Sequence, residues 1–117
     1  VAADLIAQAE HDIFAQSILI TNNKNLIKSV NSCLKEQLNK LPKRNIALKS
    51  LKKFGLTIYT SSTKKIVEII NMIAPEHLEL CTKNDTEIIK PSCFIQTNEL
   101  QINRIANKLK FSRFLLP

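Results

Sequence analysis

Short apolar runs alternate with helically periodic stretches along this chain. Two runs, 17–21 and 56–60, are rich in β-branched apolar residues, as strands buried on both faces of a sheet are. Two shorter segments, 77–80 and 93–96, are further strand candidates. Elsewhere apolar residues recur at i, i+3, i+4 and i+7, which predicts amphipathic helices. These helices cover residues 1–10, 24–41, 46–54, 63–74 and 97–110.

Capping and breaking residues mark the predicted helix ends. Asn23 stands before one helix, and Ser61 or Ser62 before another, where a side-chain oxygen can accept the first free backbone N–H groups. Gly55 closes the 46–54 helix, and Pro75 stops the helix that precedes it.

Strands that alternate with helices pair in parallel through helical crossovers. With 117 residues, 44% of them hydrophobic and 23% charged, the chain has the size and composition of one globular domain. We therefore expect an α/β fold over residues 1–117: a three-layer α/β/α, partial Rossmann-like domain with a small, mostly parallel sheet.

Composition excludes several protein classes. No run approaches the roughly 18 apolar residues of a membrane helix, and no signal-peptide pattern opens the chain, so we expect a cytoplasmic protein without a membrane partner. The single glycine leaves no glycine-rich phosphate loop. Cys33, Cys81 and Cys93 lack C-x-x-C spacing, which favours buried structural thiols in a reducing compartment.

The charge balance is basic, with 17 Lys and Arg against 10 Asp and Glu. Eight of these cations fall between Glu36 and Glu68 without an intervening acid, a pattern that can bind phosphate backbones. Phe54 and Tyr59, however, are the only aromatic residues within the run, and no nucleic-acid motif or base-stacking platform is recognisable. We interpret it as a solvated helix face and expect no nucleic-acid partner.

The first of the two histidines has a possible co-ligand nearby. Gln8 and His11 are three residues apart, so on a helix they share a face and could converge on a borderline metal such as zinc. The alternative is a histidine that interacts favourably with a helix C-terminus. Spacing alone favours the alternative, because glutamine is an uncommon metal ligand.

The second histidine follows a carboxylate at an element boundary. Glu76 and His77 come directly after Pro75, where a loop is expected, and such loops often carry catalytic groups in α/β folds. An imidazole that titrates near neutrality suits proton transfer, and a carboxylate can activate water. The alternative is a solvated polar pair.

Both histidine segments together resemble histidinol dehydrogenases. The resemblance rests on V-A-A-D-L-I-A-Q-A-E-H-D over 1–12, A-Q-S-I-L-I-T over 15–21 and I-A-P-E-H-L-E-L over 73–80. The family's own motifs, A-D-L-L-x-Q-A-E-H-D, A-Q-x-x-L-x-T and I-A-P-E-H-L-E-L, occur in the same order. The resemblance extends to about residue 82.

This resemblance implies an activity and roles for four residues. The family oxidises L-histidinol to L-histidine in histidine biosynthesis, with two successive hydride transfers to NAD. By likeness, Gln8 and His11 match zinc ligands, and the substrate-binding positions are matched by Gln8, His11, Glu76 and His77. His77 matches the proton acceptor, and Glu76 matches the group that activates water.

The chain also departs from the family pattern. Family members are several times longer, and their nicotinamide contacts lie upstream of the matching region. A further zinc ligand is an Asp in a T-P-E-x-x-G-D-Y segment, where Asn103 stands here, and the last is a His from the partner subunit. We therefore interpret the chain as a fragment or remnant of the enzyme that is inactive alone and binds neither zinc nor NAD tightly. The alternative is a non-catalytic assembly module, with a homodimer as its expected form, or a basic nucleic-acid-binding remnant.

Overall fold

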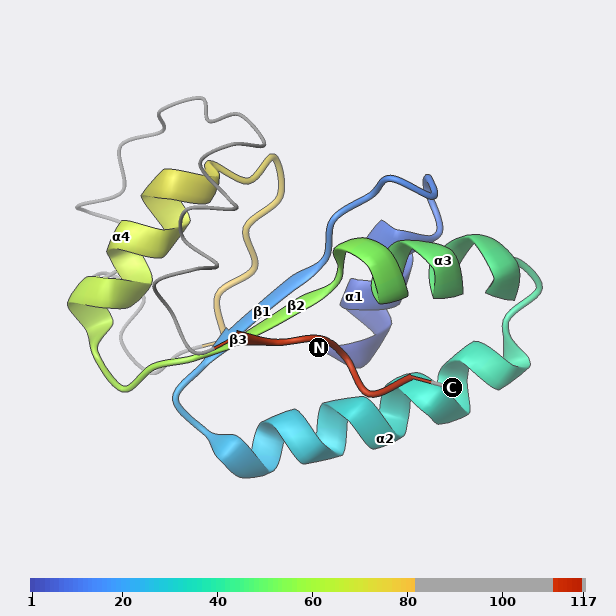
Figure 1. The fold of residues 1–117 in the computed structure, drawn as a ribbon, viewed down its shortest axis with the longest axis horizontal. Helices are drawn as coiled ribbons and strands as arrows, with labels where there is room; N and C mark the ends of the chain where they lie inside the picture. The colour runs from blue at the N-terminus through green and yellow to red at the C-terminus, as the bar shows by residue number, and fades with distance from the viewer. Residues whose placement is uncertain (82–110, 117) are drawn as a thin grey trace. The chain divides into compact units, whose positions relative to one another are not determined.

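The computed structural model describes residues 1–81 and 111–116 (Figure 1). It confirms an α/β fold. The helices are α1 (Ala2–Ala9), α2 (Lys24–Lys40), α3 (Arg44–Phe54) and α4 (Thr63–Ile73), and the strands are β1 (Ile18–Thr21), β2 (Leu56–Tyr59) and β3 (Phe111–Ser112).

The chain divides into two units. The first comprises Val1–Tyr59 with Phe111–Pro117, and the second comprises Thr60–Lys110. The sheet and α1 to α3 belong to the first unit, and α4 belongs to the second. A helical layer on each side of the sheet therefore stays a prediction, as does a single domain over residues 1–117.

The centre of the first unit is a parallel strand pair, as the sequence predicted. β1 and β2 pair from Ile18↔Leu56 to Thr21↔Tyr59, and the Leu56 N–H donates to the Ser17 carbonyl oxygen at 3.0 Å. The connection between them contains α2 and α3. The other edge of β2 is paired antiparallel with β3, a strand that the sequence analysis did not predict.

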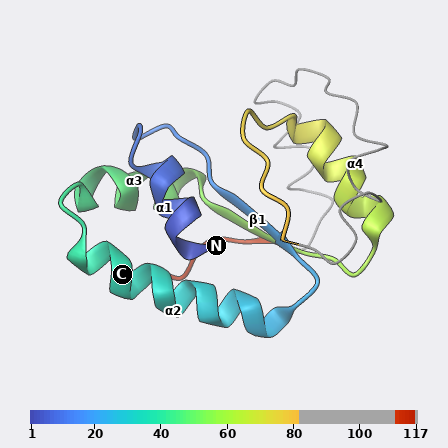
Figure 2. The ribbon, with the colours of Figure 1, turned by 180° about the vertical axis from the view of Figure 1, so that it is seen from behind.

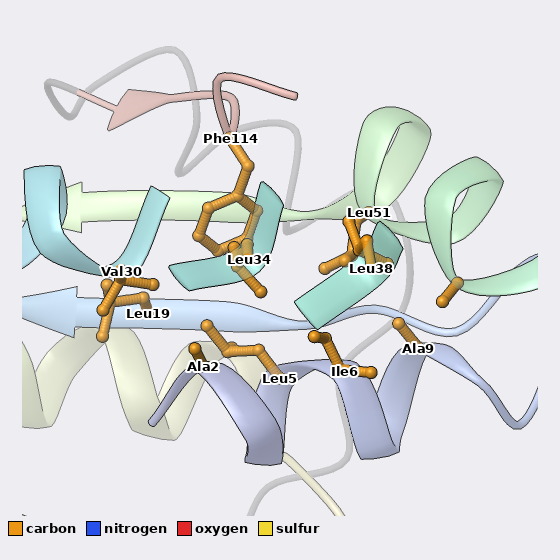
Figure 3. Packing of buried hydrophobic residues seen from close by; sticks show 11 residues of the cluster. Ala2, Leu5, Ile6, Ala9, Leu19, Val30, Leu34, Leu38, Leu51 and Phe114 are labelled. Carbon is orange, nitrogen blue, oxygen red and sulfur yellow. The ribbon is translucent and has the colours of Figure 1, made fainter. Parts of the chain in front are cut away.

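The core of the first unit forms where α1, α2 and α3 pack against one another (Figure 2). Leu34 and Leu51 are fully buried there, and Leu19 of β1 joins the cluster. Figure 3 shows the Phe114 ring reaching from the C-terminal segment toward Leu34. The cluster consists of Ala2, Leu5, Ile6, Ala9, Leu19, Val30, Leu34, Leu38, Ala47, Leu51 and Phe114.

The helix ends largely follow the predicted signals. The Asn23 side chain accepts hydrogen bonds from the backbone N–H groups of Asn25 and Leu26 at the start of α2. Ser62, rather than Ser61, caps α4 by accepting from the Lys65 N–H at 3.3 Å. α3 begins at Arg44, two residues before its predicted start.

Gly55 is required for a reason other than backbone conformation. Its φ of −67° is open to any residue, so the left-handed helix end that a closing glycine suggests does not form here. A Cβ at this position would instead collide with the Leu51 carbonyl oxygen and lie 2.7 Å from a ring carbon of Phe114. The Leu51 carbonyl oxygen and the Phe114 ring together therefore select glycine.

Two predictions about local structure are wrong. Residues 77–80 form no strand in the part of the chain that the structure describes, because their apolar pattern alone does not supply a pairing partner. Cys33 and Cys81 are exposed rather than buried. On α2 the buried positions are Val30, Asn31, Leu34 and Leu38, which leaves Cys33 outside a narrow stripe.

Other predicted features lie outside the described residues. These are the strand at 93–96, the helix at 97–110 and the thiol of Cys93. Within residues 1–81 and 111–116, no helix is long and apolar enough to span a bilayer.

Candidate functional site

Gln8 and His11 lie at the C-terminal end of α1. Gln8 is half-buried in the last turn, and His11 is exposed just beyond the helix. The His11 N–H donates to the Gln8 carbonyl oxygen at 3.4 Å, so the helical turn continues past Ala9. The structure thus places the two predicted zinc ligands in one turn at one helix end.

Buried hydroxyl groups hold the segment around His11 in place. The Ser17 Oγ–H donates to the Leu5 carbonyl oxygen at 2.9 Å, and the Ser50 Oγ–H donates to the Ala15 carbonyl oxygen at 2.8 Å. Ser17 is 3% exposed and Ser50 is 0% exposed. These bonds tie the segment after α1 to α1 itself and to α3. Sequence reasoning missed both serines, because short polar residues inside apolar stripes carry no distinguishing signal.

A local turn completes this segment. The Asp12 carboxylate accepts the Phe14 N–H at 2.7 Å, and the Asp12 carbonyl oxygen accepts the Ala15 N–H at 3.0 Å. An aspartate that bonds the backbone two residues on is a common turn former. Asp12 therefore shapes the chain directly after His11.

Glu76 and His77 follow α4 in the second unit. Ala74 ends that helix in the left-handed conformation, with φ 45° and ψ 62°, and its N–H donates to the Ile70 carbonyl oxygen at 2.8 Å. Pro75 then prevents further helix. Glu76 and His77 are both exposed, so water and small solutes reach a carboxylate and an imidazole on neighbouring residues.

The two predicted pairs belong to different units. The structure brings Gln8 together with His11 in one turn, and Glu76 together with His77 in one loop. Within the described ranges, no three His, Cys, Asp or Glu side chains gather closely enough to hold a metal ion. Catalytic zinc sites use about three protein ligands, so Gln8 and His11 fit as part of such a site only. Asn103 lies outside the described residues.

An aromatic and basic groove beside the His11 segment was not predicted. It is a hollow of about 370 Å³ lined by Ile13, Phe14, Lys49, Lys52, Lys53 and Phe54. The Phe14 and Phe54 ring centroids are 5.9 Å apart, and the Lys53 Nζ lies 6.0 Å and 5.3 Å from them. Phe14, from a distant part of the sequence, thus places a second ring beside Phe54 of the basic run.

Comparisons with known proteins agree with the motifs at both histidines. The sequence model of the histidinol dehydrogenase family matches residues 1–92. The histidinol dehydrogenase of Pelagibacter ubique is 51% identical over 89 residues, which are 76% of this chain and 21% of that protein. The corresponding protein of Caldanaerobacter subterraneus is 46% identical over 89 residues, with the same two coverages.

The fold agrees as well. The crystal structure of histidinol dehydrogenase from Elizabethkingia anophelis superimposes with a TM-score of 0.75 and 32% identity, over 82% of this chain and 22% of that chain. The chain thus spans about a fifth of the length of these relatives. With a family match over most of its residues and a shared fold, this chain belongs to the histidinol dehydrogenase family.

Proposed function

We propose that this chain supplies one part of the active site of an NAD- and zinc-dependent L-histidinol dehydrogenase. That enzyme would oxidise L-histidinol to L-histidine in two steps of histidine biosynthesis. The observation that carries the proposal is that His11, Glu76 and His77 are all exposed within motifs that match the family. A cytoplasmic location and a homodimeric assembly are part of the same proposal and rest on the resemblance.

The proposed chemistry uses the chain's own acid–base groups. The His77 imidazole takes the proton of the substrate hydroxyl as the hydride leaves the carbinol carbon. In the second oxidation the Glu76 carboxylate removes a proton from water, whose oxygen adds to the aldehyde carbon, and the resulting hydrate then loses a second hydride to become the acid. Both groups need contact with solvent or substrate, and both side chains are exposed to solvent in the structure. When bound, NAD supplies the hydride acceptor and zinc supplies a Lewis acid that orients the substrate.

Gln8 and His11 would hold zinc together with ligands from elsewhere. The anchored turn after α1 supports this role, because a metal ligand is effective when its backbone is fixed before binding. Two donors are too few for a catalytic zinc site. We therefore expect the isolated chain to bind zinc weakly and to form no NADH from NAD and L-histidinol.

The roles of Glu76 and His77 can be tested in a chimera. Residues 1–81 of this chain would replace the matching segment of the Pelagibacter ubique enzyme, and NADH formation would be followed with L-histidinol. His77→Ala and Glu76→Gln should each lower kcat by about 100-fold or more. The matched control is Glu79→Gln, a neighbouring exposed carboxylate, which should leave kcat within about twofold. Equal losses for Glu76→Gln and Glu79→Gln would contradict the assignment.

The zinc assignment is tested by calorimetry on the isolated chain. Zn²⁺ binding should be weak and should decrease further in His11→Ala. The control is His77→Ala, which removes the chain's only other histidine and should leave the affinity unchanged. Tight binding by the isolated chain, or equal effects of the two variants, would overturn the proposed partial site.

A further inference from the structure

The groove lined by Ile13, Phe14, Lys49, Lys52, Lys53 and Phe54, here called the aromatic–lysine groove, exposes two large apolar side chains. Phe14 is 66% exposed and Ile13 is 42% exposed. Burying an apolar side chain of this size is ordinarily favourable, yet the fold leaves Phe14 exposed to water. The proposed oxidation chemistry assigns no task to either residue.

The exposed ring is held by the surrounding backbone. The Phe14 N–H is bonded to the Asp12 carboxylate, and the carbonyl of the next residue, Ala15, accepts the buried Ser50 hydroxyl. On the other side, Phe54 is the last residue of α3, and the Arg113 guanidinium donates to the Lys53 carbonyl oxygen at 2.6 Å. The backbone that carries both rings therefore lies in hydrogen-bonded segments, which lowers the conformational entropy lost on binding.

The charge around the rings is strongly positive. α3 carries Arg44, Lys49, Lys52 and Lys53 and has no acidic residue, and the three lysines are exposed. Within residues 1–81 and 111–116, Asp12 is the one carboxylate that accepts a hydrogen bond from a groove residue. A purely apolar partner would leave these ammonium groups unpaired, whereas an anion alone would leave the rings in water.

One class of ligand satisfies both halves of the groove. A single-stranded nucleic acid offers flat base faces that stack on aromatic side chains and phosphates that pair with lysines. A duplex does not fit, because its bases are already stacked inside the helix. A hollow of about 370 Å³ is within the range that accommodates small ligands, so it has room for a part of a strand rather than for a folded partner.

We propose that the aromatic–lysine groove binds single-stranded nucleic acid, with a base stacked on Phe14 and phosphates on Lys49 and Lys52. This inference is independent of the proposed dehydrogenase role and involves none of Gln8, His11, Glu76 and His77.

The test is fluorescence anisotropy with the full 117-residue chain and a labelled oligothymidylate of about 12 nucleotides, at low and at physiological salt. Phe14→Ala should weaken binding about fivefold or more through lost stacking, with an unchanged salt slope, and Phe14→Trp should restore it. Lys49→Ala with Lys52→Ala should weaken binding about tenfold or more and should flatten the salt slope by about 0.7 per lost phosphate contact. Because Phe14 and both lysines are exposed, these variants are expected to fold, which circular dichroism checks.

The matched control removes two other exposed lysines, Lys28 and Lys35 of α2, as Lys28→Ala with Lys35→Ala. It loses the same charge and should change affinity by less than about threefold. Equal losses of affinity in the two double variants would show that net charge alone explains the effect and would overturn the site. The proposal also fails if Phe14→Ala binds as tightly as the parent, if a duplex binds as tightly as the single strand, or if an acidic peptide of equal charge competes equally well.

Discussion

The two segments that carry histidines are held by different means. The His11 segment follows α1 and is bonded to the rest of the first unit by the buried hydroxyls of Ser17 and Ser50. The loop with Glu76 and His77 is defined at its start by the left-handed Ala74 and by Pro75. Within the described part of the chain, no buried side chain is bonded to that loop.

The difference separates two ways of building an active site. A zinc ligand benefits from a backbone that is fixed in advance, since each coordinate bond has a set length and direction. Groups that transfer protons must meet a mobile substrate, and their hydrogen bonds often tighten only when the substrate is bound. The anchored segment and the open loop match these two needs in the proposed roles.

The largest expected contrast comes from the same truncation in both units. Leu51→Ala removes a fully buried side chain of α3 and should lower the free energy of unfolding by about 2–5 kcal/mol. Leu78→Ala removes a side chain that is 39% exposed, beside His77, and should cost about 0.5 kcal/mol. Urea titrations followed by circular dichroism measure both. Similar losses would show that the loop with Glu76 and His77 is packed as tightly as the core of the first unit and would break the comparison.

Removing one anchor should loosen the His11 segment. Ser50→Ala leaves the Ala15 carbonyl without its buried donor and should cost about 1–3 kcal/mol. Amide hydrogen exchange should accelerate between residues 12 and 16, as read by NMR. Ser32→Ala, at an exposed position on α2, is the control and should change neither quantity. Unchanged exchange in Ser50→Ala would mean that the hydroxyl does not hold this segment.

In the second unit the clearest local bond is at the start of α4. Ser62→Ala removes the oxygen that accepts the Lys65 N–H and should cost about 0.5–2 kcal/mol, as N-cap losses do. Ser61→Ala is a matched control, because Ser61 is adjacent and exposed and does not cap the helix. Chemical denaturation of the two variants side by side measures the difference, and equal midpoints would refute the cap.

The smallest effect is expected from a surface ion pair on α2. Lys40 donates a hydrogen bond to Glu36 at 2.8 Å, and this bond, with the charge of Lys40, lowers the pKa of the Glu36 carboxyl. A lowered carboxyl pKa stabilises the fold above the carboxyl's ordinary pKa, and the contribution is lost as the pH falls through the lowered value. Both side chains are at least 70% exposed, so solvent screens the pair.

Glu36→Gln therefore serves as a baseline for the other variants. Its urea midpoint should match that of the parent at neutral pH and at pH values below the ordinary carboxyl pKa. A clear difference at neutral pH that disappears in acid would show that exposed pairs matter as much here as buried hydroxyls.

Local signals predicted the helices and strands of this chain well where neighbouring residues in the sequence were enough to specify the element. Asn23 caps α2, and the apolar runs around Leu19 and Ile58 form the parallel pair. The strand predicted at 77–80 does not form, because a strand requires a partner that its own residues do not specify. Gly55 was placed correctly at a helix end, but its packing against the Phe114 ring depends on a contact between distant segments.

The candidate sites show the same division. Gln8 with His11 and Glu76 with His77 are close in sequence, and motifs alone singled them out. Tertiary packing creates the hydrogen bonds of Ser17 and Ser50 and the contact between Phe14 and Phe54. These interactions join residues that are far apart in the sequence, so no short stretch of sequence could predict them.

The position of Phe114 has a consequence for the order of events during synthesis. The first unit is built from Val1–Tyr59 and Phe111–Pro117, and the Phe114 ring, 5% exposed, belongs to its core. A ribosome makes the earlier part first, so the nascent α1, α2, β1 and β2 have an unfilled place in their core while the second unit is translated. One edge of β2 likewise stays unpaired until β3 has been made. Val1–Tyr59 is thus completed only by a segment that is made after the second unit, and folding of the first unit ends after translation has passed residue 114.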